Sequence, residues 1–155
     1  MRGDVGKIGD IIAIDVGRFN RFYAQVLQKP LYRFFDHIEL DAKIDSIIKS
    51  NEIFRVWVID DAIKRPNWHI VGNANLDKNA LSSPWFHRKD KISGTIYKYR
   101  SSPDLSAGYE EIECSLEEAS KLEAAAVWSG NHIEERLQDW LAGKENRWVR
   151  SLRLT

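Results

Sequence analysis

The sequence has a single cysteine, Cys114, and no excess of either charge sign. One cysteine excludes an internal disulfide and a zinc site built from several thiolates, and it fits a reducing compartment. Lysine and arginine together number 23, as do aspartate and glutamate. Because basic residues supply most of the affinity for nucleic acid, this balance argues against such a partner but leaves room for a local basic patch.

Long hydrophobic runs are also missing. No apolar stretch approaches the roughly 20 residues that cross a bilayer, and residues 1–7 lack the apolar segment of a signal peptide. We therefore expect no membrane association and a cytoplasmic location.

Motifs for catalysis and cofactor binding are absent as well. There is no Gly-x-Ser-x-Gly elbow and no glycine fingerprint for phosphate, and adjacent carboxylates diverge on strands and helices. No pair of histidines has metal-ligand spacing; the histidines are His37, His69, His87 and His132. Cys114 precedes an expected helix start, which favours either a reactive thiol or a small buried filler. The sequence predicts no catalytic residue, no metal and no cofactor.

Apolar material is plentiful, with 43% hydrophobic residues and six tryptophans, and it suffices for one domain over residues 1–155. Strand patterns at 11–14, 21–27 and 31–36, joined by short turns, predict an antiparallel meander. We expect its aromatic residues, Phe19 among them, to fill a core. A helix within residues 41–50, capped by Asp41, should follow, and the apolar strand at 53–59 should be central and covered on both faces.

The second half of the chain changes from strands to helices. A strand at 68–72 precedes a polar loop at 73–83, which Trp85 and Phe86 pin onto the core. Residues 94–99 read as a half-exposed edge strand, and residues 109–113 as a last short strand. Capping boxes at Ser115 and Asn131 predict two helices, the second of which ends at Gly143. Residues 144–155 form a basic tail with hydrophobic anchors, either docked as a strand or short helix or mobile.

Together these patterns predict an α+β fold. Its N-terminal antiparallel meander curls into a small barrel-like sheet with one short inserted helix, and two C-terminal helices follow.

The order of these segments resembles the immunity protein 26 family of bacterial polymorphic toxin systems, over about residues 8–141. The resemblance rests on short motifs at 9–14, 23–27, 34–36, 54–58, 68–72, 84–86, 126–128 and 132–137. It implies a bacterial protein without catalytic activity that binds a cognate toxin domain and neutralises it. It implies no contact residues, because the quoted motifs are largely apolar, and it does not reach the basic tail.

Charged residues in expected loops and at strand ends are the candidate contacts with such a partner, because aromatic or arginine anchors inside a charged rim are typical of tight interfaces. Acidic candidates would mimic phosphate if the toxin were a basic nuclease. The candidates are Arg18, Arg21, Asp60, Asp61, Asp77, His87, Arg88, Glu110 and Glu111.

Two other functions stay open. A small barrel-like nucleic-acid-associated protein would use a basic tail; its arginines are Arg147, Arg150 and Arg153. An uncharacterised enzyme would assemble its site from distant residues, for example from His69, His87 and Asp90. The oligomeric state is open too.

Overall fold

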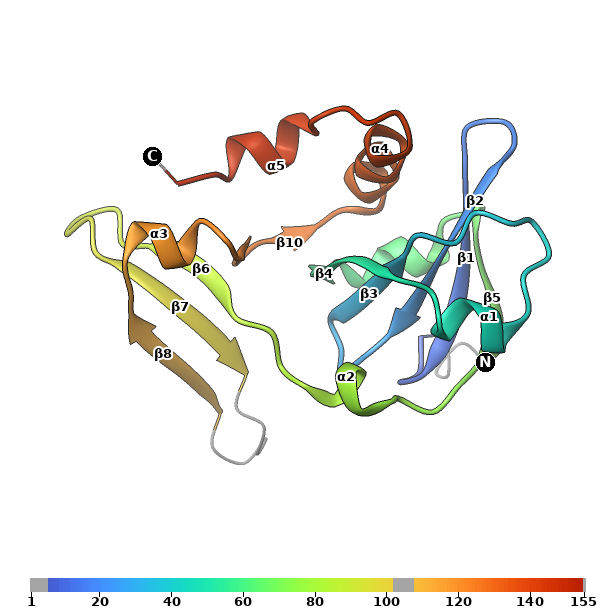
Figure 1. Cartoon of the computed structure of the whole chain (residues 1–155), viewed down its shortest axis with the longest axis horizontal. Coiled ribbons are helices and arrows are strands. Elements are labelled where there is room, and N and C mark those ends of the chain that lie inside the picture. Colours follow the sequence, from blue (N-terminus) through green and yellow to red (C-terminus); the bar gives the residue numbers. More distant parts are fainter. Residues whose placement is uncertain (1–5, 102–107, 155) are drawn as a thin grey trace.

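The computed structural model describes residues 6–101 and 108–154, which form two antiparallel-rich sheets set side by side (Figure 1). The first sheet has six strands in the order β10-β4-β3-β2-β1-β5. Its strands are β1 (Asp10–Val16), β2 (Asn20–Val26), β3 (Leu31–Phe35), β4 (Glu52–Val58), β5 (Trp68–Asn73) and β10 (Val127–Trp128). The second sheet has four strands in the order β8-β7-β6-β9. These are β6 (Phe86–Lys89), β7 (Ile96–Ser101), β8 (Tyr109–Glu113) and β9 (Glu123–Ala124).

The predicted meander is confirmed, because β1, β2, β3 and β4 pair antiparallel in sequence order. The barrel-like curl is not confirmed. The next strand, β5, pairs with β1 at the far side of the meander, and the free side of β4 takes β10. Within the described part of the chain the sheet therefore stays open, with β5 and β10 at its two edges.

The core lies on both faces of the first sheet. On β1, Ile12 and Ile14 belong to the larger apolar cluster, and Ile11 and Ala13 belong to a smaller cluster on the opposite face. All four side chains are fully buried. Because β1 lies between β2 and β5, it is shielded along its edges as well.

The expectation that residues 53–59 are covered on both faces is wrong. Burial alternates along β4, so that Phe54, Val56 and Val58 enter the larger cluster while Ile53 and Trp57 stay partly exposed. Trp57 instead faces the second sheet, where its ring lies 4.4 Å from that of Phe86. An apolar run predicts a strand but not how its faces are covered. Both faces can be buried, or one face can be buried while the other contacts a second sheet, as here.

The second sheet corrects two further expectations. Strand β7 pairs with β6 on one side and with β8 on the other, so it is not an edge strand. Strand β6 begins at Phe86, where the sequence indicated only a residue that pins a loop. The polar run after Phe86 has little β propensity, and its strand conformation depends on the partners that it finds in β7 and β9.

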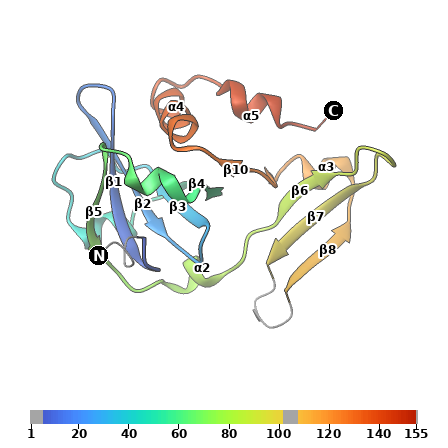
Figure 2. The same ribbon diagram turned by 180° about the vertical axis from the view of Figure 1, so that it is seen from behind.

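One short segment joins the two sheets. Strand β9 runs parallel to β6, with Glu123 opposite Phe86, and three residues later β10 runs parallel to β4, with Val127 opposite Trp57. The same segment therefore forms one edge of each sheet, beside the Trp57–Phe86 contact. In both ribbon views it crosses between the sheets (Figures 1 and 2).

Helices lie in the connections between strands, and all of those described are short except α4. They are α1 (Ile44–Ile48), the 3-10 helix η1 (Asp60–Lys64), α2 (Lys78–Leu81), α3 (Leu116–Ala119), α4 (Gly130–Leu141) and α5 (Arg147–Ser151). Helix α4 buries Ile133 and Leu137 in the larger cluster. In the C-terminal tail, α5 is a short helix, and Trp148 stacks on His132 of α4 with their rings 4.0 Å apart.

The expected helix caps are confirmed in part. Ser115 caps α3 by accepting a hydrogen bond from the Glu118 amide at 3.1 Å. Gly143, with φ of 69°, follows the end of α4 as expected. Asp41 and Asn131 are not caps, because α1 begins after Lys43 and α4 after Ser129, and neither of these residues makes a side-chain capping bond. Both expected caps were misplaced by two residues, which is the usual uncertainty of helix ends.

Candidate partner-binding surface

The charged candidates of the second sheet are already paired across its strands. Arg88 of β6 donates two hydrogen bonds to Glu111 of β8, at 2.9 and 2.6 Å, and its guanidinium lies over the Tyr97 ring. Arg100 likewise pairs with Glu110 at 3.0 Å. The hydrogen bonds with Glu111 raise the pKa of Arg88, and those from Arg88 lower the pKa of Glu111. Glu110 and Glu111 are therefore not free carboxylates of the kind that mimics phosphate.

Asp77 acts as a helix cap, and His87 is buried. Asp77 caps α2, with its carboxylate accepting the Ala80 amide at 2.8 Å, and it lies 3.5 Å from the guanidinium of Arg33. The amide hydrogen bond and the charge of Arg33 lower the pKa of Asp77. The side chain of His87 is 6% exposed, and burial lowers its pKa. Neither residue presents a charge that is free to meet a partner.

His87 lines a cavity of about 270 Å³ between β6, the segment that contains β9, and α5. Its Nδ1 atom has no hydrogen-bond partner among the residues that the structure describes. The other residues around the cavity are mostly apolar or small, and the carboxylate of its Glu123 binds Arg136 at 2.9 and 2.7 Å. The cavity therefore offers one imidazole, and the carboxylate beside it, Glu123, is engaged by Arg136 rather than free to act with it.

The enzyme alternative required His69, His87 and Asp90 to converge, and the structure keeps them apart. His69 lies on β5 at the outer edge of the first sheet and pairs with Asp15 at 3.2 Å. Asp90 lies at the end of β6 and accepts the amides of Ile92 and Ser93. In residues 6–101 and 108–154, no three histidine, cysteine, aspartate or glutamate side chains gather as metal ligands do.

Cys114 does not have an activated thiol. Burial and the charge of Glu118 raise its pKa, so the thiol stays protonated and is a poor nucleophile. Of the two readings left open for this residue, the geometry favours the filler, although the side chain is only partly buried.

The arginines of the C-terminal tail do not form a basic stripe. Arg147 pairs with Glu135 of α4 at 3.0 Å, and Arg153 pairs with Glu145. Acidic neighbours therefore offset two of the three charges on which the nucleic-acid alternative relied.

Asp60 and Asp61 form the first turn of η1 and are both exposed. Asp61 lies 3.8 Å from Lys64 one turn later, which is a loose surface pair. Since carboxylates at the start of a helix are stabilised by its dipole, these two residues need no partner to account for their place.

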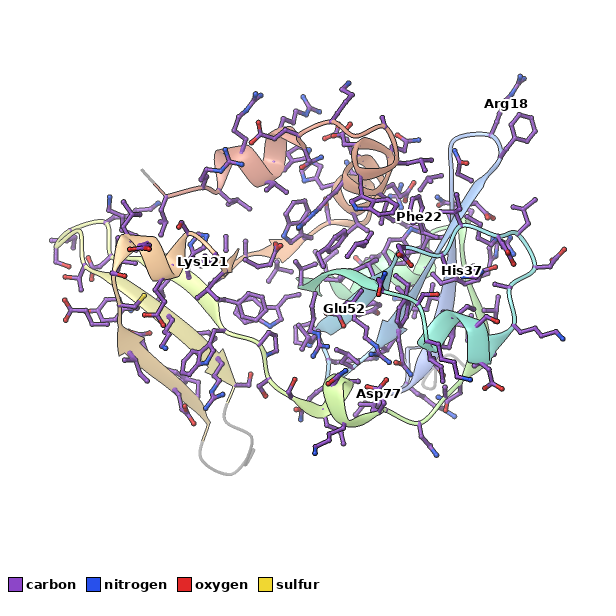
Figure 3. The ribbon with its side chains drawn as sticks, viewed as in Figure 1. Arg18, Phe22, His37, Glu52, Asp77 and Lys121 are labelled. Atoms are coloured by element: carbon purple, nitrogen blue, oxygen red, sulfur yellow. The ribbon has the colours of Figure 1, made fainter. Side chains whose placement is uncertain are left out.

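The tip of the β1–β2 hairpin differs from all of these candidates. Arg18 is exposed, and it makes no hydrogen bond or ion pair with any other described residue. Phe19 beside it is 77% exposed, so the expectation that it fills the core is wrong. Gly17, with φ of 60°, turns the chain so that both side chains point outward at the tip. The tip stands clear of the rest of the molecule, with Arg18 at its end (Figure 3).

The base of this hairpin is held from several sides. Arg21 donates to both carboxylate oxygens of Asp15, at 2.6 and 3.1 Å, and to the Leu40 carbonyl at 3.1 Å. Asn67 donates to the carbonyl of Asp15 at 2.8 Å. The hydrogen bonds and charge of Arg21, helped by His69, lower the pKa of Asp15. Arg21 is thus a residue that positions the hairpin rather than one that is free to contact a partner.

Helix α4 flanks the hairpin on one side. The Trp140 ring meets the Phe22 ring edge-on at 5.9 Å, and Trp140 remains 43% exposed. An arginine, a phenylalanine and a tryptophan thus remain accessible on and beside one projecting hairpin. Arginine and aromatic residues are the side chains that most often anchor protein interfaces.

The immunity protein 26 family model matches residues 7–98, which is more than half of the chain. The chain belongs to the immunity protein 26 family. The match contains the whole β1–β2 hairpin and ends within β7. The motifs at 126–128 and 132–137, on which the resemblance also drew, lie beyond the matched range.

No curated protein and no solved structure matches this chain. None of the helices in the described residues is both long enough and apolar enough to cross a membrane.

Proposed function

We propose that this member of the immunity protein 26 family neutralises a bacterial polymorphic toxin by binding the toxin domain directly, in the cytoplasm and without catalysis. The family match over residues 7–98 carries the proposal. It is supported by the separation of His69, His87 and Asp90 and by the protonated thiol of Cys114, which leave the enzyme alternative without an assembled site.

A protein that acts only by binding requires a stable scaffold and an exposed contact surface. The doubly covered strand β1 supplies the scaffold, and the exposed residues beside it supply candidate contacts. Of the charged candidates, Arg18, Asp60 and Asp61 remain the most accessible, because the others are paired within the fold, act as a cap or are buried.

The test has two steps. The purified chain, immobilised, is exposed to lysate of its source cell, washed at high salt, and the retained polypeptide is identified by mass spectrometry. That polypeptide is then expressed alone and together with this chain in a heterologous bacterium. Growth arrest by the polypeptide alone, relieved by co-expression, is the expected result. A retained polypeptide without toxicity, or toxicity that co-expression does not relieve, would contradict the proposal.

A further inference from the structure

The tip of the β1–β2 hairpin has the chemistry of an interface anchor that lacks its partner in the monomer. Phe19, in the turn between β1 and β2, exposes 77% of its surface, although phenylalanine is among the residue types most often buried. Arg18 next to it forms no ion pair with the described residues, whereas the neighbouring Arg21 is engaged by Asp15. An exposed aromatic ring and an unpaired guanidinium at adjacent positions favour contact with another protein.

The hairpin is pre-organised for such a contact. The hydrogen bonds of Asp15, Arg21 and Asn67 hold its base, and the Phe22 ring packs against Trp140 on the side of α4. A segment that is already fixed in its bound shape loses little conformational entropy on binding, and this raises affinity. Only the tip itself, beyond this network, has to adapt to the partner.

We infer that the β1–β2 hairpin inserts Phe19 and Arg18 into a cleft of the toxin that has an apolar floor and an acidic rim. This inference rests on the proposed function. A projecting tip needs a concave partner, the Phe19 ring requires an apolar pocket, and the Arg18 guanidinium requires a carboxylate. Trp140, 43% exposed at the side of the hairpin, lies where it covers the edge of the contact.

The positive charge of Arg18 distinguishes insertion of the hairpin tip from phosphate mimicry, which requires negative charge. The cleft of a nuclease is basic because it binds phosphate, and Arg18 would be repelled there. Of the carboxylates that were candidates for phosphate mimicry, Glu110 and Glu111 are held by Arg100 and Arg88, whereas Asp60 and Asp61 stay exposed on η1 and are not part of the hairpin. The acidic character of the cleft that receives the hairpin thus follows from the charge of Arg18 alone.

The chain contains a matched control in the β6–β7 hairpin. Its tip also carries a cation and an apolar residue side by side, Lys91 and Ile92, and Ile92 is 99% exposed. Substitution there removes the same kinds of side chain from the other sheet. Fold and solubility effects of tip substitutions should be the same for both hairpins.

The experiment measures the affinity of the retained polypeptide, already shown to arrest growth, for the wild-type chain and for tip variants by biolayer interferometry. We expect Phe19→Ala to weaken binding about 30-fold and Arg18→Glu about 100-fold or more, as for interface hot spots. We expect Ile92→Ala and Lys91→Glu to change it less than about threefold. Circular dichroism and a thermal melt establish that each variant is folded.

The salt dependence tests the acidic rim separately. Raising the salt concentration should weaken binding of the wild-type chain more than binding of Arg18→Ala, since that variant lacks the charge that the acidic rim attracts. If the Phe19 and Arg18 variants bind as tightly as the Lys91 and Ile92 variants, the inference is overturned while the proposed function stands. If wild-type binding does not relieve toxicity, the proposed function fails, and the inference fails with it.

Discussion

The two sheets of this protein are built in different ways. In the first sheet, β1 buries all four of its central apolar residues, and the strands around it contribute side chains such as Phe22, Val26 and Phe34 that have no exposed surface. In the second sheet, every residue of β7 is at least partly exposed. Its strands are joined instead by ion pairs that cross them, Arg88 with Glu111 and Arg100 with Glu110.

This difference indicates where the free energy of folding resides. Burial of apolar surface stabilises far more than exposed ion pairs do, because water and salt screen the pairs. The first sheet should therefore form the stable body of the molecule, and the second should depend on its contacts with the first through Trp57 and Phe86 and through the segment that contains β9 and β10. Substitutions in the two sheets can break or sharpen this comparison.

The largest effect is expected in the core of the first sheet. Phe34 is fully buried, and its ring stacks on that of Phe54 at 4.7 Å. Phe34→Ala removes this packing and leaves a cavity, and we expect it to lower the free energy of unfolding by about 3–5 kcal/mol. Urea denaturation at 25 °C measures the change.

Tyr99→Ala is the matched substitution in the second sheet. The Tyr99 ring contacts Trp57 at 5.7 Å and Tyr109 at 5.1 Å but remains partly exposed. We expect Tyr99→Ala to lower the free energy of unfolding by about 1–2 kcal/mol, because the partly solvated ring buries less apolar surface than Phe34. Equal losses for Phe34→Ala and Tyr99→Ala would show that both sheets contribute equally to one cooperative core. That result would contradict the view that the first sheet forms the stable body of the molecule.

A loss between those of Phe34→Ala and Tyr99→Ala is expected at the buried polar pair of the first sheet. The Gln25 side-chain oxygen accepts two hydrogen bonds from Arg33, at 2.9 and 2.6 Å, and both residues are at most 3% exposed. Gln25→Leu leaves the guanidinium without this acceptor, and we expect a loss of about 2–3 kcal/mol. The double substitution Gln25→Leu, Arg33→Met should recover part of it, because no unpaired buried charge remains.

Glu111→Gln in the second sheet supplies the contrast, measured by the same urea titration. It removes the charge of the Arg88–Glu111 ion pair, which at 2.6 Å is as close as the shorter Arg33–Gln25 hydrogen bond but is only partly buried. We expect no resolvable change in the denaturation midpoint. A loss as large as that of Gln25→Leu would mean that cross-strand ion pairs, and not burial, hold the second sheet together.

Sequence patterns predicted the first sheet better than the second for a physical reason. The meander follows from alternating apolar residues and turn residues that lie next to one another in the chain, such as those around Gly17. The pairing of β5 with β1, and of β9 and β10 with two different sheets, joins residues distant in the chain. Strands of two residues have no periodicity to detect.

The sequence identified the charged residues of the candidate surface, but it could not show which of them are paired with one another in the fold. Arg88 and Glu111 belong to strands that are not neighbours, and they meet diagonally across β7, where Arg88 lies opposite Tyr97 and Glu111 opposite Tyr99. No local pattern contains that register, so the sequence could not show that these charges neutralise each other. For Phe19 a local signal was present, because its place between Gly17 and Asn20 puts it at a turn, where apolar residues are seldom covered.

Stability should also depend on pH through His87, the buried histidine of the second sheet. Burial lowers the pKa of His87 in the folded chain, although the charge of Glu123 opposes this. In the unfolded chain the pKa is near 6.5. Above that pH both states hold neutral His87, and stability does not depend on it. As the pH falls below 6.5, the unfolded state takes up the proton first, so stability declines until the pH reaches the folded pKa.

One proton limits the slope to about 1.4 kcal/mol per pH unit. Urea denaturation of the wild-type chain and of His87→Leu, at intervals between pH 7.5 and pH 5, isolates this contribution from those of the other histidines. We expect the difference in the free energy of unfolding between the two proteins to shift in favour of His87→Leu as the pH falls. Parallel profiles would mean that the imidazole is protonated in the folded state, and therefore that solvent reaches the cavity beside β6 and hydrates it.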